Sequence, residues 1–345
     1  MSDASNSSSE ALERWLLVRG RGDRRLAPMV NAHELRAHSS TRRPSVQRGD
    51  LAVCYAAGWQ SIFAVVEVTG EPENDPERTR WCWRFPIRPL LALADLRDAP
   101  PVEAAGVLRR SLGRHSYIRL TADQYALGRA ALAAHVVGAG YDAMADRFAA
   151  WQADIGGMSG PRRTKRLLAR LPERPDVLEL GVGAGAEQSR LLAERGQLIA
   201  VDVSEQQLRR ARERLPGAKL LHADLQAVDF PARRFDAVMS FYALNHVPRE
   251  SLRPLLEHVA RWLRPAGWFL AAFAASDLEG WHGDFLGAPS FFSGYVPEVN
   301  EALVREAGLE IVESEVETIH EPEGAARFHW VLAQAPPEAH PAAPS

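Results

Sequence analysis

The chain has 345 residues, of which 46% are hydrophobic and 25% are charged, and its formal net charge is -3. This length suits two domains of ordinary size. The two cysteines, Cys54 and Cys82, have no CxxC spacing, which excludes a structural zinc site and a disulfide framework. Charged residues interrupt every apolar run, so we expect a soluble cytoplasmic protein with no membrane partner. We also expect no metal.

The N-terminal segment 1–10 is rich in Ser and lacks the basic and apolar regions of a signal peptide, so we expect a disordered lead-in. Charge then differs along the chain. Residues 11–120 hold 18 Arg against 12 Asp and Glu, whereas residues 141–335 hold 22 Lys and Arg against 28 Asp and Glu. This difference favours two units with different partners, although scattered solvated charge would give the same counts.

Short β segments fill the first third of the chain. Val, aromatic and other strand-forming residues lie between Gly, Pro and Asp breaks at 15–18, 51–55, 62–68 and 81–87. We predict a small β-barrel domain over residues 11–128. From Thr121 the pattern becomes helical and rich in Ala, and we interpret residues 129–140, which contain Gly138 and Gly140, as a linker.

Strand-like and helical segments alternate over residues 141–334, which predicts an α/β domain with a doubly wound seven-stranded sheet; residues 335–345 read as a disordered tail. The expected strands are 176–180, 197–202, 219–222, 235–240 and 267–273. Ligands of such sheets bind beyond the carboxyl ends of the strands. The site is therefore expected at 181–187, 202–204, 224–226 and 240–246.

A glycine-rich turn follows the first of these strands. Gly181, Gly183 and Gly185 allow a tight turn and a close approach of backbone amides to a ligand at a helix N-terminus. The same turn, with Ala186 and with Asp202 at the spacing of a ribose-binding acid, also fits a dinucleotide fingerprint. An NAD-dependent oxidoreductase therefore stays open on the turn alone.

Two acidic residues favour a different ligand. Glu179 precedes the turn, where a carboxylate would repel a pyrophosphate but suit an amino-acid ammonium group, and Asp224 ends the third strand, where it could accept a hydrogen bond from an adenine amine. With Phe235-Asp236 and the Leu263-Arg-Pro-Ala-Gly267 turn, this order resembles class I S-adenosylmethionine-dependent methyltransferases. The resemblance implies that the cofactor is S-adenosylmethionine, that Asp202 binds the ribose, that Val203 and Leu225 flank the adenine, and that Ser240 lines the methionine end.

The same resemblance extends to two candidate catalytic residues. His246, in Phe241-Tyr-Ala-Leu-Asn-His246, resembles a histidine that faces the methyl group in small-molecule methyltransferases, and its ordinary pKa would suit a general base. Tyr141 resembles a tyrosine that closes over the cofactor from an N-terminal helix. A histidine bonded to backbone and a core tyrosine are the alternatives.

An aromatic insertion over residues 281–295 is too long for an ordinary connection. It could wall a substrate pocket through His282, Phe291, Phe292 and Tyr295, or pack as a flap on the sheet. Ser240-Phe-Tyr-Ala243 stands where amine methylation of DNA bases needs Asn or Asp before Pro-Pro, and residues 141–335 hold no cysteine nucleophile for C5 methylation of pyrimidines. A small molecule or a polar side chain of a peptide remains, and we predict a small-molecule acceptor with an oxygen or nitrogen nucleophile.

Residues 12–128 resemble the EVE-type branch of the PUA-like barrels through 15–18, 48–55, 63–68 and the Arg88-Pro-Leu stretch. That family implies a modified base held between aromatic side chains, here Trp15, Trp59, Trp81 and Trp83, with Arg42 and Arg43 near phosphates. A structural or docking barrel is the alternative. The second functional hypothesis is therefore a modified-nucleic-acid binding protein, or a methyltransferase directed to nucleic acid.

Overall fold

The computed structural model describes residues 12–20, 25–112, 115–155, 159–322 and 324–338. The predicted lead-in 1–10 and most of the predicted tail lie outside these residues. The chain divides into two compact units, Met1–Leu132 and Ala133–Ser345. Among the described residues, no helix has both the length and the apolar character needed to cross a membrane.

The first unit contains one sheet whose strands follow the order β2-β6-β4-β3-β1-β7, with β5 added on β6. Its strands are β1 (Arg14–Arg19), β2 (Ala37–Ser40), β3 (Leu51–Ala56), β4 (Ser61–Val68), β5 (Glu73–Asn74), β6 (Trp83–Ala92) and β7 (Tyr117–Arg119). Three short 3-10 helices connect them: η1 (Ala32–Leu35), η2 (Val102–Ala105) and η3 (Arg109–Leu112). The four predicted strands are present.

This sheet curls so that its two ends approach each other. The Arg19 guanidinium at the end of β1 donates to the Ala37 carbonyl of β2 at 2.8 Å, and the Tyr117 hydroxyl of β7 donates to the Arg43 carbonyl at 3.5 Å. Strands β3 and β4 form the core, since nearly all their side chains are buried. The curl is what the predicted barrel requires, and a PUA-like identity remains an expectation.

Helix α1 (Ala122–Asp154) corrects the predicted linker, because residues 129–140 lie inside it. The two glycines of the predicted linker, Gly138 and Gly140, serve packing rather than flexibility. A Cβ on Gly138 would lie 2.8 Å from the Val203 carbonyl oxygen, and one on Gly140 would lie 2.2 Å from the Pro289 carbonyl oxygen. Glycine is therefore needed at both positions for the backbones to approach this closely.

The second unit is built on a seven-stranded sheet in the order β10-β9-β8-β11-β12-β16-β15. The strands from β10 to β12 are parallel, and β16 pairs antiparallel with both β12 and β15. The strands are β8 (Asp176–Leu180), β9 (Gln197–Asp202), β10 (Lys219–His222), β11 (Phe235–Phe241), β12 (Leu263–Ala274), β15 (Glu310–Glu321) and β16 (Gly324–Gln334). The predicted doubly wound sheet is confirmed.

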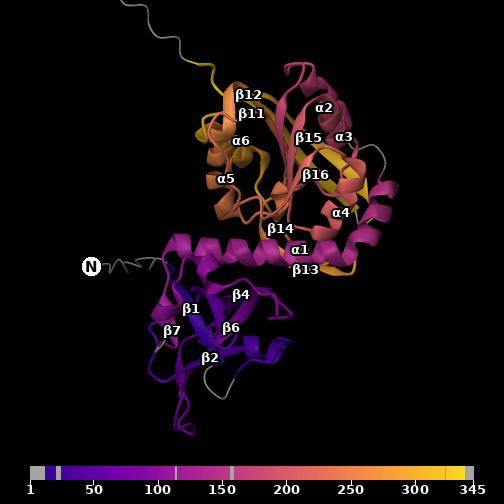
Figure 1. Ribbon diagram of the computed structural model, residues 1–345. Helices are drawn as coiled ribbons and strands as arrows, with labels where there is room; N and C mark the ends of the chain where they lie inside the picture. Colours follow the sequence, from indigo (N-terminus) through magenta and orange to yellow (C-terminus); the bar gives the residue numbers. More distant parts are fainter. Residues whose placement is uncertain (1–11, 21–24, 113–114, 156–158, 323, 339–345) are drawn as a thin grey trace, which may run out of the picture. The chain divides into compact units, whose positions relative to one another are not determined.

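Helices cover both faces of this sheet (Figure 1). One hydrophobic cluster joins the sheet to α5 (Arg249–Trp262) and α6 (Pro297–Glu306), and the other joins it to α2 (Gly160–Leu168), α3 (Glu187–Arg195) and α4 (Glu205–Arg214). A 3-10 turn, η4 (Leu244–His246), follows β11. Strand order reverses between β8 and β11, which is where a ligand site is expected in such sheets.

The aromatic insertion forms a separate two-stranded hairpin, β13 (Leu278–Phe285) and β14 (Ala288–Gly294). It packs along the second half of α1. The Arg147 guanidinium donates to the Leu286 carbonyl at 2.6 Å, and the indole of Trp151 meets the ring of Phe285 edge-on at 5.5 Å between centroids.

Candidate functional site

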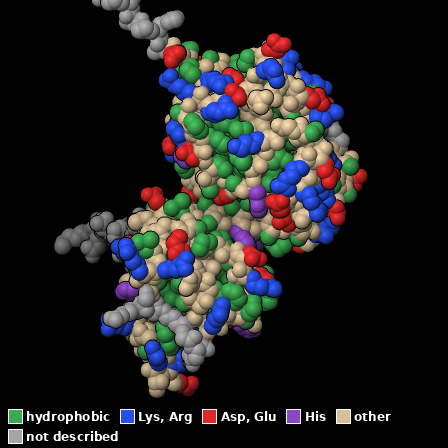
Figure 2. Space-filling view, viewed as in Figure 1, with side chains coloured by type: hydrophobic (Ala, Val, Ile, Leu, Met, Phe, Trp, Pro, Cys, Tyr) green, Lys and Arg blue, Asp and Glu red, His purple; other side chains and the backbone are tan. Residues whose placement is uncertain are grey.

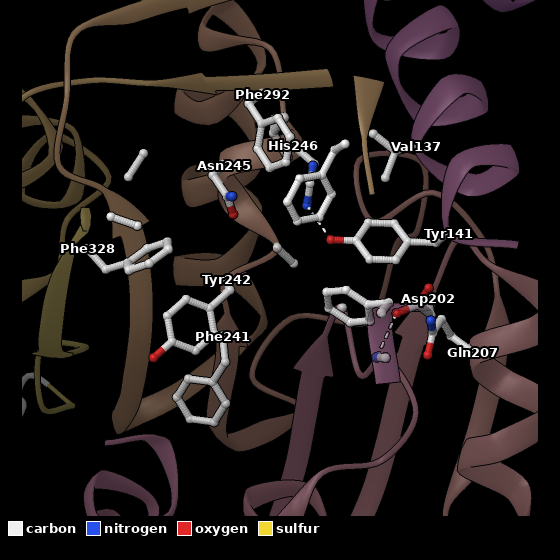
Figure 3. A pocket seen from close by; sticks show the side chains of 18 of the residues that line it. Val137, Tyr141, Asp202, Gln207, Phe241, Tyr242, Asn245, His246, Phe292 and Phe328 are labelled. Carbon is white, nitrogen blue, oxygen red and sulfur yellow. Dashed lines mark hydrogen bonds between the residues drawn. The ribbon is translucent and has the colours of Figure 1, made fainter. Parts of the chain in front are cut away.

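A cavity of about 690 Å³ lies in the second unit at the carboxyl ends of the parallel strands (Figure 3). Its lining includes residues from all four predicted loops: 181–184 and 186, 202–203, 224–226, and 241–243 with 245–246. Most of the remaining lining comes from α1, from one or two residues each of α2, α3 and α4, from the end of β12, from the β13–β14 hairpin and from the adjoining ends of β15 and β16. The volume is within the range of small-molecule and cofactor sites.

The glycine turn leaves room where side chains would otherwise stand. Gly181 has a φ of +81°, and a Cβ there would lie 2.2 Å from the Cβ of Ala243. Gly183 has a φ of +55°, and a Cβ on it would meet nothing within 4 Å, because the residue faces the cavity. The turn is therefore a cradle that any side chain at Gly183 would begin to fill.

Two carboxylates project into the cavity from neighbouring strand ends. Asp202 accepts hydrogen bonds from the backbone amides of Gly183 at 2.7 Å and Ser204 at 2.9 Å, one on each oxygen. Each oxygen keeps a lone pair for a ligand hydroxyl. Asp224 is held likewise by the amide of Gln226 at 2.9 Å. Burial raises the pKa of both carboxyls.

Helix α1 is fixed at this edge by polar contacts. The Asp142 carboxylate accepts hydrogen bonds from the Ser204 hydroxyl at 2.6 Å and from the Gln206 amide at 2.9 Å, at the start of α4. These bonds satisfy N-terminal donors of that helix and place a negative charge at the positive end of its dipole. The same contacts set the position of Tyr141, which precedes Asp142.

Gln207 is a cavity residue that the sequence analysis missed. Its side chain is only 2% exposed, and neither its amide nitrogen nor its amide oxygen has a hydrogen-bond partner among the described residues. It lines the cavity beside Asp202 (Figure 3). Leaving both ends of a buried amide unpaired costs about 1–3 kcal/mol for each group, which a bound ligand would recover. Its position in the first turn of α4, just after the strand that ends at Asp202, was the sequence signal that could have identified it.

Three predicted cofactor residues lie outside the cavity lining. The Ser240 hydroxyl donates to the Leu180 carbonyl at 3.0 Å within the sheet, so it does not form the methionine end. A Cβ on Gly185 would lie 3.0 Å from the Leu215 side chain, so this glycine packs the turn against the end of α4. The Glu179 carboxyl is 1% exposed and accepts from the Ser189 hydroxyl at 2.8 Å.

Glu179, which the sequence analysis expects to suit an amino-acid ammonium group, is buried and lies outside the cavity lining. Burial raises its pKa to about 8, and its second oxygen has no hydrogen-bond partner among the described residues. The group is therefore largely protonated at neutral pH. A role toward an ammonium group remains a prediction.

Tyr141 and His246, predicted separately, are brought together in the cavity wall (Figure 3). The Tyr141 hydroxyl lies 3.0 Å from Nε2 of His246, and Nδ1 of His246 lies 2.8 Å from the Phe291 carbonyl oxygen. A carbonyl can only accept, so Nδ1 carries the proton and Nε2 accepts the Tyr141 hydroxyl proton. The chain of bonds runs from α1 through the histidine to the β13–β14 hairpin.

This arrangement bears on the role predicted for His246. Burial lowers the pKa of His246 to about 4, and both ring nitrogens are already engaged. A general base needs a free lone pair and a pKa near the working pH. The role of His246 as a base therefore stays a prediction, and the structure shows its hydrogen bond to Tyr141.

Aromatic side chains form a closed ring of contacts in the cavity lining. Successive members meet with centroids 4.7–5.6 Å apart, in the order Tyr141, Phe148, Trp151, Phe285, Phe292, His246 and back to Tyr141. All six line the cavity. Such spacings are typical of favourable edge-on and stacked contacts.

Of the four predicted substrate residues, only Phe292 lines the cavity. Phe291 is 2% exposed and contributes its carbonyl, His282 is directed to the Ser290 carbonyl at 3.0 Å, and the Tyr295 ring lies under the Arg249 guanidinium at 4.5 Å. Alternate residues of a strand point to opposite sides, which separates Phe291 from Phe292. The hairpin instead contributes Leu278, Trp281 and Phe285.

The predicted aromatic walls of the first unit are only partly available. Trp15 is 4% exposed and donates from its indole to Asp50 at 2.8 Å, so it belongs to the core. The Trp59 indole donates to the Leu26 carbonyl at 2.9 Å. Arg43 lies over the Trp83 ring at 5.6 Å. On the face shown in Figure 2, acidic and basic side chains are interspersed, which is the pattern expected for scattered solvated charge.

Comparisons with known proteins agree with this site. Residues 177–267 match the family model of a methyltransferase domain. The chain is 30% identical over 170 residues to the ubiquinone/menaquinone biosynthesis C-methyltransferase of Yersinia pestis, covering 45% of this chain and 63% of that protein. It is 34% identical over 111 residues to an uncharacterized methyltransferase of Mycobacterium bovis, covering 31% of this chain and 55% of that protein. The chain thus spans less than two thirds of either relative.

Solved structures are also similar to part of the chain. A DhpI complex with S-adenosylhomocysteine has a TM-score of 0.48 at 22% identity, covering 59% of this chain and 98% of that one. The 1,6-didemethyltoxoflavin-N1-methyltransferase of Burkholderia thailandensis has a TM-score of 0.43 at 20% identity, covering 58% and 91%. The matched residues 177–267 contain both strand-end carboxylates, so the family model and the geometry together support a methyltransferase domain in the second unit.

Proposed function

We propose that the protein transfers the methyl group of S-adenosylmethionine to a small-molecule acceptor bound in this cavity. The observation that supports it best is that one cavity contains both the Asp202 and Asp224 carboxylates and the aromatic ring around Tyr141 and His246. The first group suits an adenosine and the second suits an apolar acceptor. A single site can therefore align the two reactants.

The residues present fit the cofactor. Asp202 has a lone pair on each oxygen for the ribose hydroxyls, Asp224 can accept from the adenine amine, and Val203 and Leu225 line the cavity where they could flank the adenine. The turn at Gly183 offers open space for the rest of the molecule. The bound cofactor supplies an electrophilic methyl group on a sulfonium.

A small acceptor is favoured over a macromolecule because α1 and the hairpin enclose the acceptor side. Besides the Arg147 bond to Leu286, Gly140 packs directly on Pro289, and His246 links Tyr141 to Phe291. Walls on this side restrict the size of the group that can reach the aromatic side chains, which favours a small ligand.

The proposal is tested by incubating the full chain with methyl-labelled S-adenosylmethionine and a metabolite library. We expect S-adenosylhomocysteine and one labelled small product to form together. Asp202→Asn should reduce product formation at sub-saturating cofactor by more than tenfold, whereas Ser240→Ala, which removes a hydroxyl outside the cavity, should retain cofactor binding. Methyl transfer only to nucleic acid or protein would contradict the proposal.

A further inference from the structure

The acceptor side of the cavity is aromatic, and the groups that could remove a proton there are few. Six rings form its closed wall. The charged or titratable side chains that line the whole cavity, besides Tyr141, Tyr242 and His246, are Asp202, Asp224, Arg214, Glu321 and Arg327. Asp202 and Asp224 belong to the adenosine end. Among the carboxylates of the described lining, Glu321 at the end of β15 is the remaining candidate for a base, and a nucleophile that carries no proton to be removed would not require it.

On these grounds we propose that the acceptor is a planar aromatic molecule whose nucleophile is a neutral nitrogen with its own lone pair, so that no protein base takes part. This inference rests on the proposed function and specifies its substrate class. It follows from two observations: the ring of aromatic side chains, and the engagement of both nitrogens of His246 by Phe291 and Tyr141.

The charge balance distinguishes a nitrogen acceptor from an oxygen acceptor. When a neutral nitrogen attacks, its lone pair forms the N–C bond, the electrons of the C–S bond stay on sulfur, and the positive charge passes from sulfur to nitrogen. No proton has to move during the step. A neutral hydroxyl would need a base, and a phenolate would bring a buried negative charge into an apolar wall at a large desolvation cost.

Aromatic faces also suit this charge movement. A cation over an aromatic ring is attracted by the negative face of the ring, and the attraction is stronger when the pair is shielded from water. The cationic nitrogen formed after transfer would lie among the faces of Phe292, Phe285 and Trp151, all of which line the cavity. A ring of this kind stacks on a planar acceptor before transfer and stabilises the charged product after it.

Tyr141 has a defined part in this scheme. The Tyr141 hydroxyl donates its hydrogen bond to Nε2 of His246 at 3.0 Å. Its oxygen can therefore only accept a hydrogen bond from a ligand at the cavity wall. For an acceptor with an N–H, that oxygen can hold the hydrogen and so direct the nitrogen lone pair. Tyr141 and His246 are thus positioning residues, and His246→Gln, which can still accept from Tyr141, should restore most of the turnover that His246→Ala loses.

The test uses matched planar probes with labelled S-adenosylmethionine: isoquinoline with a ring nitrogen, 2-naphthol with a hydroxyl, and naphthalene with no nucleophile. Calorimetry with S-adenosylhomocysteine present measures the binding of each probe, and mass spectrometry measures transfer. We expect isoquinoline to bind and to give N-methylisoquinolinium at least tenfold faster than 2-naphthol is methylated. Phe292→Leu should weaken binding of all three probes, whereas Phe230→Leu, an aromatic contact outside the cavity lining, should not.

Each result decides between the claims. Methylation of 2-naphthol at a comparable rate, or loss of nitrogen methylation in Glu321→Gln, would overturn the base-free nitrogen scheme. Tight cofactor binding with no probe bound would overturn the aromatic acceptor class while the proposed function stands. Failure to bind the cofactor at all would overturn the proposed function itself. A third readout needs no turnover: nitrogen NMR of His246 should show a protonated Nδ1 and an unprotonated Nε2 from pH 6 to 8, and titration in that range would contradict the scheme.

Discussion

The packing of helix α1 on the hairpin at Gly140 can be perturbed with a closely matched control. An added Cβ would lie 2.2 Å from the Pro289 carbonyl oxygen, and ordinary contacts begin near 3.4 Å, so Gly140→Ala must move the hairpin away by about 1.2 Å. Overpacking costs about 1–3 kcal/mol, of which up to about 1 kcal/mol is offset because Ala is a better helix former than Gly.

The functional effect should be larger than the effect on stability. The hairpin presents Phe285 and Phe292 to the acceptor, and misplacement by about 1 Å can lower a rate on the order of 100-fold. We expect Gly140→Ala to lose about 100-fold in turnover while cofactor affinity changes little, because Asp202 and Asp224 are held by other contacts. Denaturant unfolding, calorimetry and steady-state kinetics give the three quantities.

Gly196→Ala is the control. Its Cβ would lie 2.2 Å from the Pro175 carbonyl oxygen, the same clash with the same kind of atom, and Gly196 is not part of the cavity lining. This variant should lose comparable stability and keep its turnover. If both variants lose turnover equally, or if Gly140→Ala keeps full activity, then the hairpin does not position the acceptor and the reasoning is wrong.

Two further predictions concern buried polar groups. Gln207→Met removes two unpartnered amide atoms, so it should raise the melting temperature of the free protein and weaken the binding of S-adenosylhomocysteine; an unchanged affinity would show that this amide does not meet the ligand. The free energy of unfolding is expected to fall on both sides of pH 6.5, for different groups. His246 and His38 have folded pKa values of about 4 and about 3 against 6.5, so stability is full above pH 6.5 and is lost as pH falls toward those values. Glu179 has a folded pKa of about 8 against 4.5, so its contribution is full below pH 4.5 and is lost as pH rises toward 8. The free energy of unfolding should therefore peak near pH 6.5, and Glu179→Gln should flatten the decline from pH 6.5 to 8; an unchanged decline would refute the assignment.

The position of the site could be predicted from the sequence because topology fixes it. The carboxyl ends of parallel strands meet at one edge, so the loops with Gly183, Asp202 and Asp224 had to converge there. The resemblance added Tyr141 and His246, and the structure joins them by a hydrogen bond of 3.0 Å.

Side-chain directions could not be predicted in the same way. Ser240 and Glu179 lie on strands that end at the edge of the sheet where the cavity lies. Their side chains nevertheless form hydrogen bonds inside the fold, with the Leu180 carbonyl and the Ser189 hydroxyl. Only knowledge of the packed neighbours decides which way such a group faces.

Glycine was ambiguous for a related reason. Gly138 and Gly140 in a helix and glycines in a linker look alike in a single sequence, and only the close approach of Val203 and Pro289 distinguishes them. The aromatic ring was missed because Phe148 and Trp151 follow Tyr141 on one face of a helix whose partner, the hairpin, is more than 100 residues away in the chain.

The central claim is that the cavity binds S-adenosylmethionine through the Asp202 end. Calorimetric titration of the full chain with S-adenosylmethionine and with NAD tests it most directly. The account predicts saturable binding of the first and none of the second, with affinity at least tenfold weaker in Asp202→Ala, because charge-assisted hydrogen bonds contribute about 1.5–3 kcal/mol. Tight binding of NAD, or an affinity for S-adenosylmethionine that Asp202→Ala leaves unchanged, would contradict it.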